Sequence, residues 1–144
     1  MGDEDSFEIR GYDPDGTLRE IIRLAGVDLT LPAEEVQQAH ERMTGGKAEP
    51  AWSKLFWDAV PKTRPAYSRL LLDALGNLWV AEYVSVADAP RNWMVFAADG
   101  SLSGMVTVPP HFAPSEIGVD YVLGVTVEDP GVEHIRRYAL KRGS

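Results

Sequence analysis

The N-terminal part of the chain has a hydrophobic pattern with a period of two. Phe7 and Ile9 alternate with polar residues, which is typical of a strand with one buried face. Asp13–Gly16 has the composition of a tight turn, and its glycine is free to adopt a positive φ. Residues 17–24 then supply a return strand. We therefore expect a β-hairpin in this region.

Between residues 29 and 46 the hydrophobic period becomes that of a helix. Thr30 is a suitable N-cap, Pro32 suits the first turn, and Gly45 begins a glycine pair that ends the helix. The apolar face of this helix consists of Val36, Ala39, His40 and Met43. The same spacing predicts a second, short helix, which Pro61 ends and whose apolar positions are Trp52, Leu55, Phe56 and Ala59.

From Ser68 onwards the pattern predicts strands and turns only. The expected strands cover residues 68–72, 78–84, 93–97, 102–108, 121–127 and 133–140, with another short strand at Ile117. Glycine-containing turns separate them at short intervals. The chain is therefore expected to be all-β with a short helical insert.

Two of the expected hairpins repeat each other. When Asp15 is aligned with Asp99, 84 positions later, the matched pairs are Ile9 with Trp93, Tyr12 with Phe96, Leu18 with Leu102, and Ile22 with Val106. A third, partial copy matches Ile135–Tyr138 to Ile9–Tyr12. A repeated four-stranded antiparallel unit is typical of a β-propeller, so we predict about two propeller-like blades. A β-sandwich is the alternative.

The repeat suggests how the chain is organised. We interpret residues 1–144 as one propeller-like domain. In this interpretation residues 7–28 form a hairpin of two outer blade strands, residues 29–64 the helical insert, residues 65–110 a complete blade and residues 111–142 a partial blade. Such a piece would expose strand edges, which proteins rarely leave bare.

Composition is that of a globular protein and argues against several partners. The chain has 144 residues, of which 44% are hydrophobic and 25% charged. The net charge of −8 disfavours nucleic acid and anionic membrane surfaces as partners. The absence of cysteine excludes disulfides and thiolate chemistry. No apolar run is long enough to span a membrane, and the acidic Met1–Asp5 does not look like a signal peptide, so we expect a soluble chain in an unassigned compartment.

Three segments resemble known proteins. They are Leu72–Val80 and the stretches WMVFAADGSLSGMVTVP and SEIGVDYVLGVTVEDPGVEHIRRYAL. These segments resemble blades of six-bladed β-propellers, which include NHL-repeat proteins and the superfamily of virginiamycin B lyase and gluconolactonase. The last two stretches are similar to the C-terminal blades of a bacterial six-bladed family. The resemblance covers most of residues 7–24 and 65–142.

The chain is shorter than the proteins it resembles. Six blades of about 40 residues need roughly 240 residues, so the resemblance implies a propeller fragment. A fragment with bare strand edges is expected to self-associate through them. A homotrimer with two blades per chain would close a ring of six, and a small two-sheet monomer is the competing arrangement.

Candidate chemistry is sparse. Asp73 and Asn77 offer two side chains to a Ca²⁺ ion that takes about six to eight oxygens, so we interpret them as a hairpin turn with Gly76 at positive φ. No serine or cysteine nucleophile motif is present. None of the three histidines has the spacing of a zinc ligand: His40, His111 and His134. We therefore assign no catalytic residue, metal or cofactor.

The aromatic part of the insert contains the candidate ligand-binding residues. Trp52 and Phe56 lie on the apolar stripe of the second expected helix, and Trp57 lies beside that stripe. Inserts between blades emerge on one face of a propeller, where ligands commonly bind. These side chains either recognise a ligand or pack onto the sheets.

Taken together, these features favour a non-catalytic β-propeller scaffold or binding module that assembles blades between chains. Its ligand, a small molecule or a peptide, is not identified by the sequence. The alternative is a metal-dependent enzyme of the lyase or lactonase kind with its site at the propeller axis. That site would need metal ligands from several blades, and stoichiometric Ca²⁺ or Zn²⁺ in the purified protein would favour it.

Overall fold

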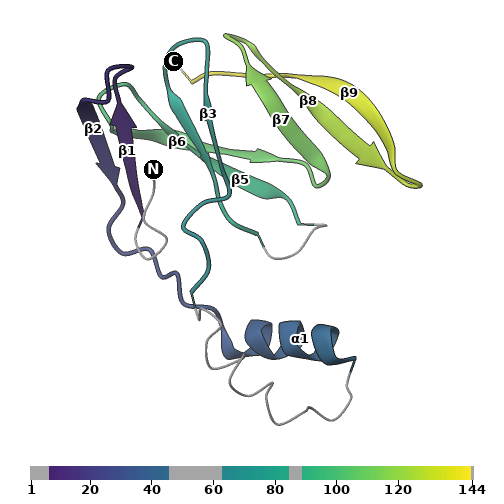
Figure 1. Ribbon diagram of the computed structural model, residues 1–144. Helices are drawn as coiled ribbons and strands as arrows, with labels where there is room; N and C mark the ends of the chain where they lie inside the picture. Colours follow the sequence, from purple (N-terminus) through teal and green to yellow (C-terminus); the bar gives the residue numbers. More distant parts are fainter. Residues whose placement is uncertain (1–6, 46–62, 85–88, 144) are drawn as a thin grey trace.

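The computed structural model describes residues 7–45, 63–84 and 89–143 (Figure 1). Within these ranges the chain is all-β with one helix, as the sequence predicts. The elements in chain order are β1 Glu8–Tyr12, β2 Leu18–Arg23, α1 Ala33–Thr44, β3 Arg69–Leu72, β4 Leu78–Ala81, β5 Arg91–Phe96, β6 Leu102–Val108, β7 Phe112–Ile117, β8 Tyr121–Glu128 and β9 Val132–Ala139.

The described strands form three antiparallel sheets. The first is the hairpin β1–β2, the second contains β3–β6 in sequence order, and the third contains β7–β9 in sequence order. Figure 1 shows the first and third sheets on opposite sides of the second, with α1 set apart from all three. The sheets therefore follow one another in space as they do along the chain.

The hairpin repeat seen in the sequence is present in the backbone. Tyr12 pairs with Leu18 after a register shift at Gly11, and Phe96 pairs with Leu102 after a register shift at Val95. Both turns have the same hydrogen bonds: an aspartate side chain accepts from the amide two residues later, at 2.8 Å in the first and 2.9 Å in the second. The two hairpins are therefore structurally equivalent as well as similar in sequence.

The two central strands of the second sheet, β4 and β5, are buried on both faces. Val80 pairs with Met94 on the face that meets the first sheet, whereas Trp79 pairs with Val95 on the face that meets the third. Successive residues of a strand point to opposite faces, so the alternation divides β4 and β5 between two separate hydrophobic cores. These cores hold the three sheets together as layers.

The helix begins later than predicted, and its cap is different. Pro32 occupies the N-cap position without a side-chain hydrogen bond, so the expectation that Thr30 caps the helix was wrong. The amide of Thr30 instead donates to Asp28, and its backbone forms an isolated bridge with Thr63. Gly45 ends the helix in the left-handed conformation, as predicted. The second expected helix lies outside the described residues.

One strand was expected only as a fragment. β7 extends from Phe112 to Ile117, although only its last residue had been assigned to a strand. A register shift between Pro114 and Glu116 inserts one extra residue, so Phe112, Pro114 and Ile117 are all buried. The bulge breaks the period of two on which the strand prediction depends. Pro114 is tolerated because β7 is an edge strand of its sheet.

Candidate functional site

Asp73 accepts more hydrogen bonds than any other described carboxylate. It lies in the turn between β3 and β4, and its side chain has no solvent exposure. One oxygen accepts from the amides of Leu75 and Asn77, each at 2.9 Å. The other accepts from the Asn77 side chain at 2.9 Å and from the Trp79 indole at 3.0 Å. Gly76 has a φ of 82°, so the predicted turn is confirmed.

Arg142 ties this turn to the third sheet. Its guanidinium donates to Asp73 at 2.9 Å and to the carbonyl oxygens of Gly118 and Val119 at 2.9 and 2.7 Å. The amide of Ala74 also donates to the carbonyl of Ile117 at 2.9 Å. The Asp73 cluster, defined as Asp73 with these donors, is therefore a junction between the second and third sheets.

The donors around Asp73 control its protonation. Burial alone raises the pKa of this carboxyl, but the hydrogen bonds from Asn77, Trp79 and Arg142 outweigh burial and lower the pKa to about 2. The charge is satisfied by protein donors on both oxygens. This arrangement is that of a structural carboxylate rather than of a metal ligand or a general base.

The described histidines are not brought into a metal site. The described residues contain no group of three or more histidine, aspartate or glutamate side chains that could hold a metal ion. His134 lies in β9, 3.7 Å from Glu128, and His111 has a positive φ of 62° before β7. Trp52, Phe56 and Trp57, the predicted ligand-binding residues, lie outside the described residues.

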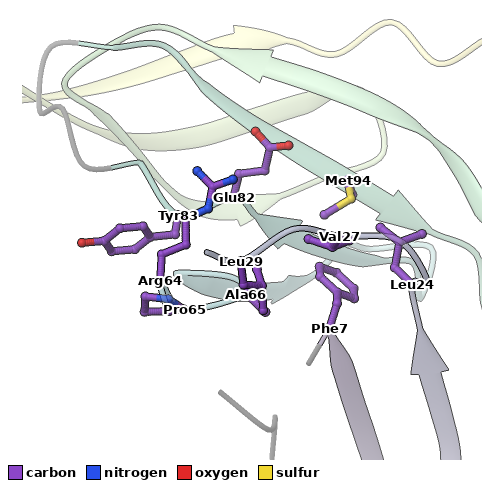
Figure 2. A pocket seen from close by; sticks show the side chains of 10 residues that line it. All are labelled: Phe7, Leu24, Val27, Leu29, Arg64, Pro65, Ala66, Glu82, Tyr83 and Met94. Atoms are coloured by element: carbon purple, nitrogen blue, oxygen red, sulfur yellow. The ribbon is translucent and has the colours of Figure 1, made fainter. Parts of the chain in front are cut away.

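A small cavity lies between the first and second sheets, where sequence analysis assigned no site (Figure 2). We call it the Arg64 cavity; its volume is about 160 Å³. Its wall is mostly apolar, and its lining residues are Phe7, Leu24, Val27, Leu29, Arg64, Pro65, Ala66, Glu82, Tyr83 and Met94. Phe7, Leu29 and Met94 also belong to the first hydrophobic core, so one wall of the cavity is part of that core.

The polar groups of the cavity lie at one end. Figure 2 shows Arg64 and Tyr83 at the left, Glu82 at the upper centre, and Phe7 and Met94 at the right of the view. The Arg64 guanidinium donates to the carbonyl of Asp28 at 3.3 Å, which uses one of its five N–H donors.

The carboxylate of Glu82 is held at this polar end. It accepts from the Asn92 side chain at 3.2 Å. Asn92 in turn accepts from the hydroxyl of Thr107 at 2.7 Å. The cavity therefore has an apolar end and an end with one cationic and one anionic group.

Sequence reasoning could not find this cavity. Its residues come from five separate stretches: Phe7, residues 24–29, residues 64–66, residues 82–83 and Met94. Arg64 is placed by the hydrogen bond from its amide to the carbonyl of Leu29, at 2.8 Å, which closes the base of the insert. No local motif accompanies such a contact between distant residues, so the sequence contains no signal for it.

No known family model, curated protein or solved structure matches this chain. The only described helix, α1, is too short and too polar to cross a membrane. The candidate site therefore rests on its own geometry.

Proposed function

We propose that the chain is a non-catalytic, propeller-like binding module and that its ligand occupies the Arg64 cavity. The stack of three antiparallel sheets and the repeated hairpin support the propeller-like part of this proposal. The amphipathic lining of the cavity is the observation that carries the binding part. Concave, mostly apolar pockets with a few converging polar groups are the usual form of small-molecule sites.

The size of the cavity restricts the ligand. Pockets for drug-sized molecules usually measure about 300–1,000 Å³, so 160 Å³ is too small for them. A protein cavity of about 150 Å³ holds a molecule the size of benzene. The ligand is therefore a metabolite with a short apolar group, whose polar end reaches the mouth of the cavity.

The charges select the head group of the ligand. A guanidinium binds a carboxylate through two parallel hydrogen bonds, so Arg64 suits an anionic group. Glu82, at the same end of the cavity, suits an ammonium group. A zwitterion with an aliphatic side chain satisfies both and fills the apolar end. The proposed ligand class is therefore an aliphatic α-amino acid.

Calorimetric titration with L-leucine tests the proposal. We expect a dissociation constant of roughly 1 mM, since a ligand of this size gains only a fraction of a kcal/mol per atom. N-acetyl-L-leucine lacks the ammonium group and L-leucinamide lacks the carboxylate, so each should bind about tenfold or more weakly, because one charge in the site loses its partner.

Two variants locate the binding. Arg64→Gln should weaken L-leucine binding about tenfold, because charge-assisted hydrogen bonds contribute about 1.5–3 kcal/mol. Arg69→Gln is the matched control, since Arg69 is exposed in β3 and does not line the cavity. No detectable binding of leucine, or equal binding by wild type and Arg64→Gln, would rule out this ligand site.

A further inference from the structure

The third sheet exposes a largely apolar outer face. We define the C-terminal outer face as the side of β7–β9 that points away from the second sheet; its residues include Glu116, Tyr121, Leu123, Val125, Val127, Glu133, Ile135 and Arg137. Ile135 is 80% exposed and Val127 44% exposed. Leaving an aliphatic surface of this kind in water is unfavourable, so it marks an interaction site.

The first sheet exposes an outer face of its own. We define the N-terminal outer face as the side of β1–β2 opposite to the buried pair Ile9 and Ile22; its residues are Glu8, Arg10, Tyr12, Leu18, Ile21 and Arg23. Tyr12 is 49% exposed and Ile21 40% exposed. Figure 1 shows the first and third sheets at opposite ends of the stack. One chain therefore presents two separate faces.

The internal repeat shows what normally covers a surface like the C-terminal outer face. Ile135 is equivalent to Ile9 and Trp93 in the repeat. Ile9 is 5% exposed because the second sheet covers it, and Trp93 is 1% exposed because the third sheet covers it. In both cases the cover is the next sheet along the chain. For Ile135 there is no next sheet among the described residues.

The same comparison applies in reverse to the N-terminal outer face. Tyr12 is equivalent to Phe96, which is 2% exposed because the preceding sheet, β1–β2, covers it. Phe7, directly before β1, lies with its ring centroid 6.1 Å from that of Phe96. Tyr12 has no preceding sheet among the described residues. The C-terminal outer face thus lacks a following sheet to cover it, and the N-terminal outer face lacks a preceding one. Each of the two faces is the kind of surface that could cover the other.

We propose that the C-terminal outer face of one copy of this chain packs on the N-terminal outer face of a second copy. The contact would continue between chains the sheet-to-sheet packing that already occurs twice within the chain. Net charges also agree: two arginines and one glutamate give the N-terminal outer face +1, whereas two glutamates and one arginine give the C-terminal outer face −1. Opposite charges favour this pairing over two identical faces meeting.

The contact joins two different faces, so it is heterologous. Such contacts close into rings when the rotation between copies allows it, and they extend into filaments when it does not. The two outer faces are the surfaces through which a propeller-like module is expected to self-associate, and in that respect the proposed contact rests on the proposed function. It does not depend on the Arg64 cavity.

The absence of cysteine makes a cross-linking experiment direct. An isotopically labelled Ile135→Cys chain is mixed with an unlabelled Tyr12→Cys chain and oxidised mildly, and the covalent dimers are weighed by mass spectrometry. We expect the ratio of mixed dimer to homodimers to be at least several-fold higher than the ratio that random pairing of the two chains would give. Ile21→Cys, on the same outer face as Tyr12, serves as a second partner if Tyr12→Cys does not fold.

Leu72→Cys is the matched control for the Tyr12 partner. Leu72 is 70% exposed on β3 and belongs to neither outer face, so its dimers with Ile135→Cys should form only at the random ratio. A dominance of Ile135→Cys homodimers would overturn the proposal and show that two C-terminal outer faces meet instead. Random ratios throughout would refute self-association through these faces, and would leave the leucine titration as a separate test of the cavity.

Discussion

Replacing Asp73 by asparagine is expected to weaken the junction between the second and third sheets. The substitution keeps the shape of the side chain but removes its charge. It also places an amide N–H₂ where the carboxylate now accepts hydrogen bonds from Asn77, Trp79 and Arg142. These donors would then face another donor instead of an acceptor. Their charge-assisted hydrogen bonds are therefore lost, and they are left without an acceptor.

The magnitude follows from the protonation equilibrium of Asp73. The fall of its pKa from 3.8 to about 2 corresponds to about 2.4 kcal/mol, at 1.36 kcal/mol for each pKa unit. Asp73→Asn should therefore lower the free energy of unfolding by about 2–4 kcal/mol at pH 7, the upper part arising from unpaired buried donors. Asp15→Asn is the control, because Asp15 also holds a hairpin turn through a turn amide, that of Thr17, but at an exposed position, so the protein should lose much less stability.

The pH dependence provides a second measurement. The folded-state pKa of Asp73 lies below its unfolded-state value, so the stabilisation is complete above about pH 4 and is lost as the pH falls through about 2. The free energy of unfolding of wild type and Asp73→Asn, measured with urea at several pH values, should therefore differ at neutral pH and become similar in acid. Equal stability of the two proteins at pH 7, or a difference that does not change with pH, would refute this account of the Asp73 cluster.

Two further pairs of variants test the packing, each by urea unfolding. Gly124→Ala should lower the free energy of unfolding by about 2–3 kcal/mol, because a Cβ at this position would lie 2.3 Å from a backbone oxygen of β7. A Cβ at Gly104 would have no atom within 4 Å, so Gly104→Ala should lower it by less than about 0.5 kcal/mol. Equal losses would contradict the close contact at Gly124. Trp79→Phe should cost about 1.5–3 kcal/mol more than Trp93→Phe, because the Trp79 indole donates to Asp73 while the Trp93 indole is buried without a partner among the described residues. A larger loss for Trp93→Phe would show that packing volume, rather than this hydrogen bond, dominates.

Local rules succeeded where a short stretch of chain contains the whole cause. Asp15, Asp73 and Asp99 all precede a glycine with positive φ, and all three hold their turns through a side-chain bond to a nearby amide. The all-β class follows from the short alternating stretches between such turns. The helix end at Gly45 was predicted for the same reason.

Local rules failed where a distant partner competes. Thr30 has the chemistry of an N-cap, but its backbone pairs with Thr63, so the chain is still extended there and the helix begins only after Pro32. Only the end of strand β7, at Ile117, was predicted, because its bulge breaks the alternation. In both cases tertiary contacts changed the meaning of a local pattern.

The candidate site shows the same division. The sequence directed attention to the aromatic residues Trp52, Phe56 and Trp57, which lie outside the described residues. The cavity depends on Arg64 and Glu82, which no motif distinguishes from the other charged residues of the chain. Its chemistry becomes apparent only when the first two sheets are packed together.

The sequence by itself determined the turns, the strand periods and the repeated hairpin, because each depends on residues within a few positions of one another. The tertiary structure decided that Arg142 meets Asp73, that Arg64 and Glu82 line one cavity, and that Ile135 remains exposed while its equivalents Ile9 and Trp93 are buried. These outcomes depend on which sheet packs on which face. Equivalent residues lie in similar local sequence but have different neighbours in space, and the burial of a side chain depends on those neighbours.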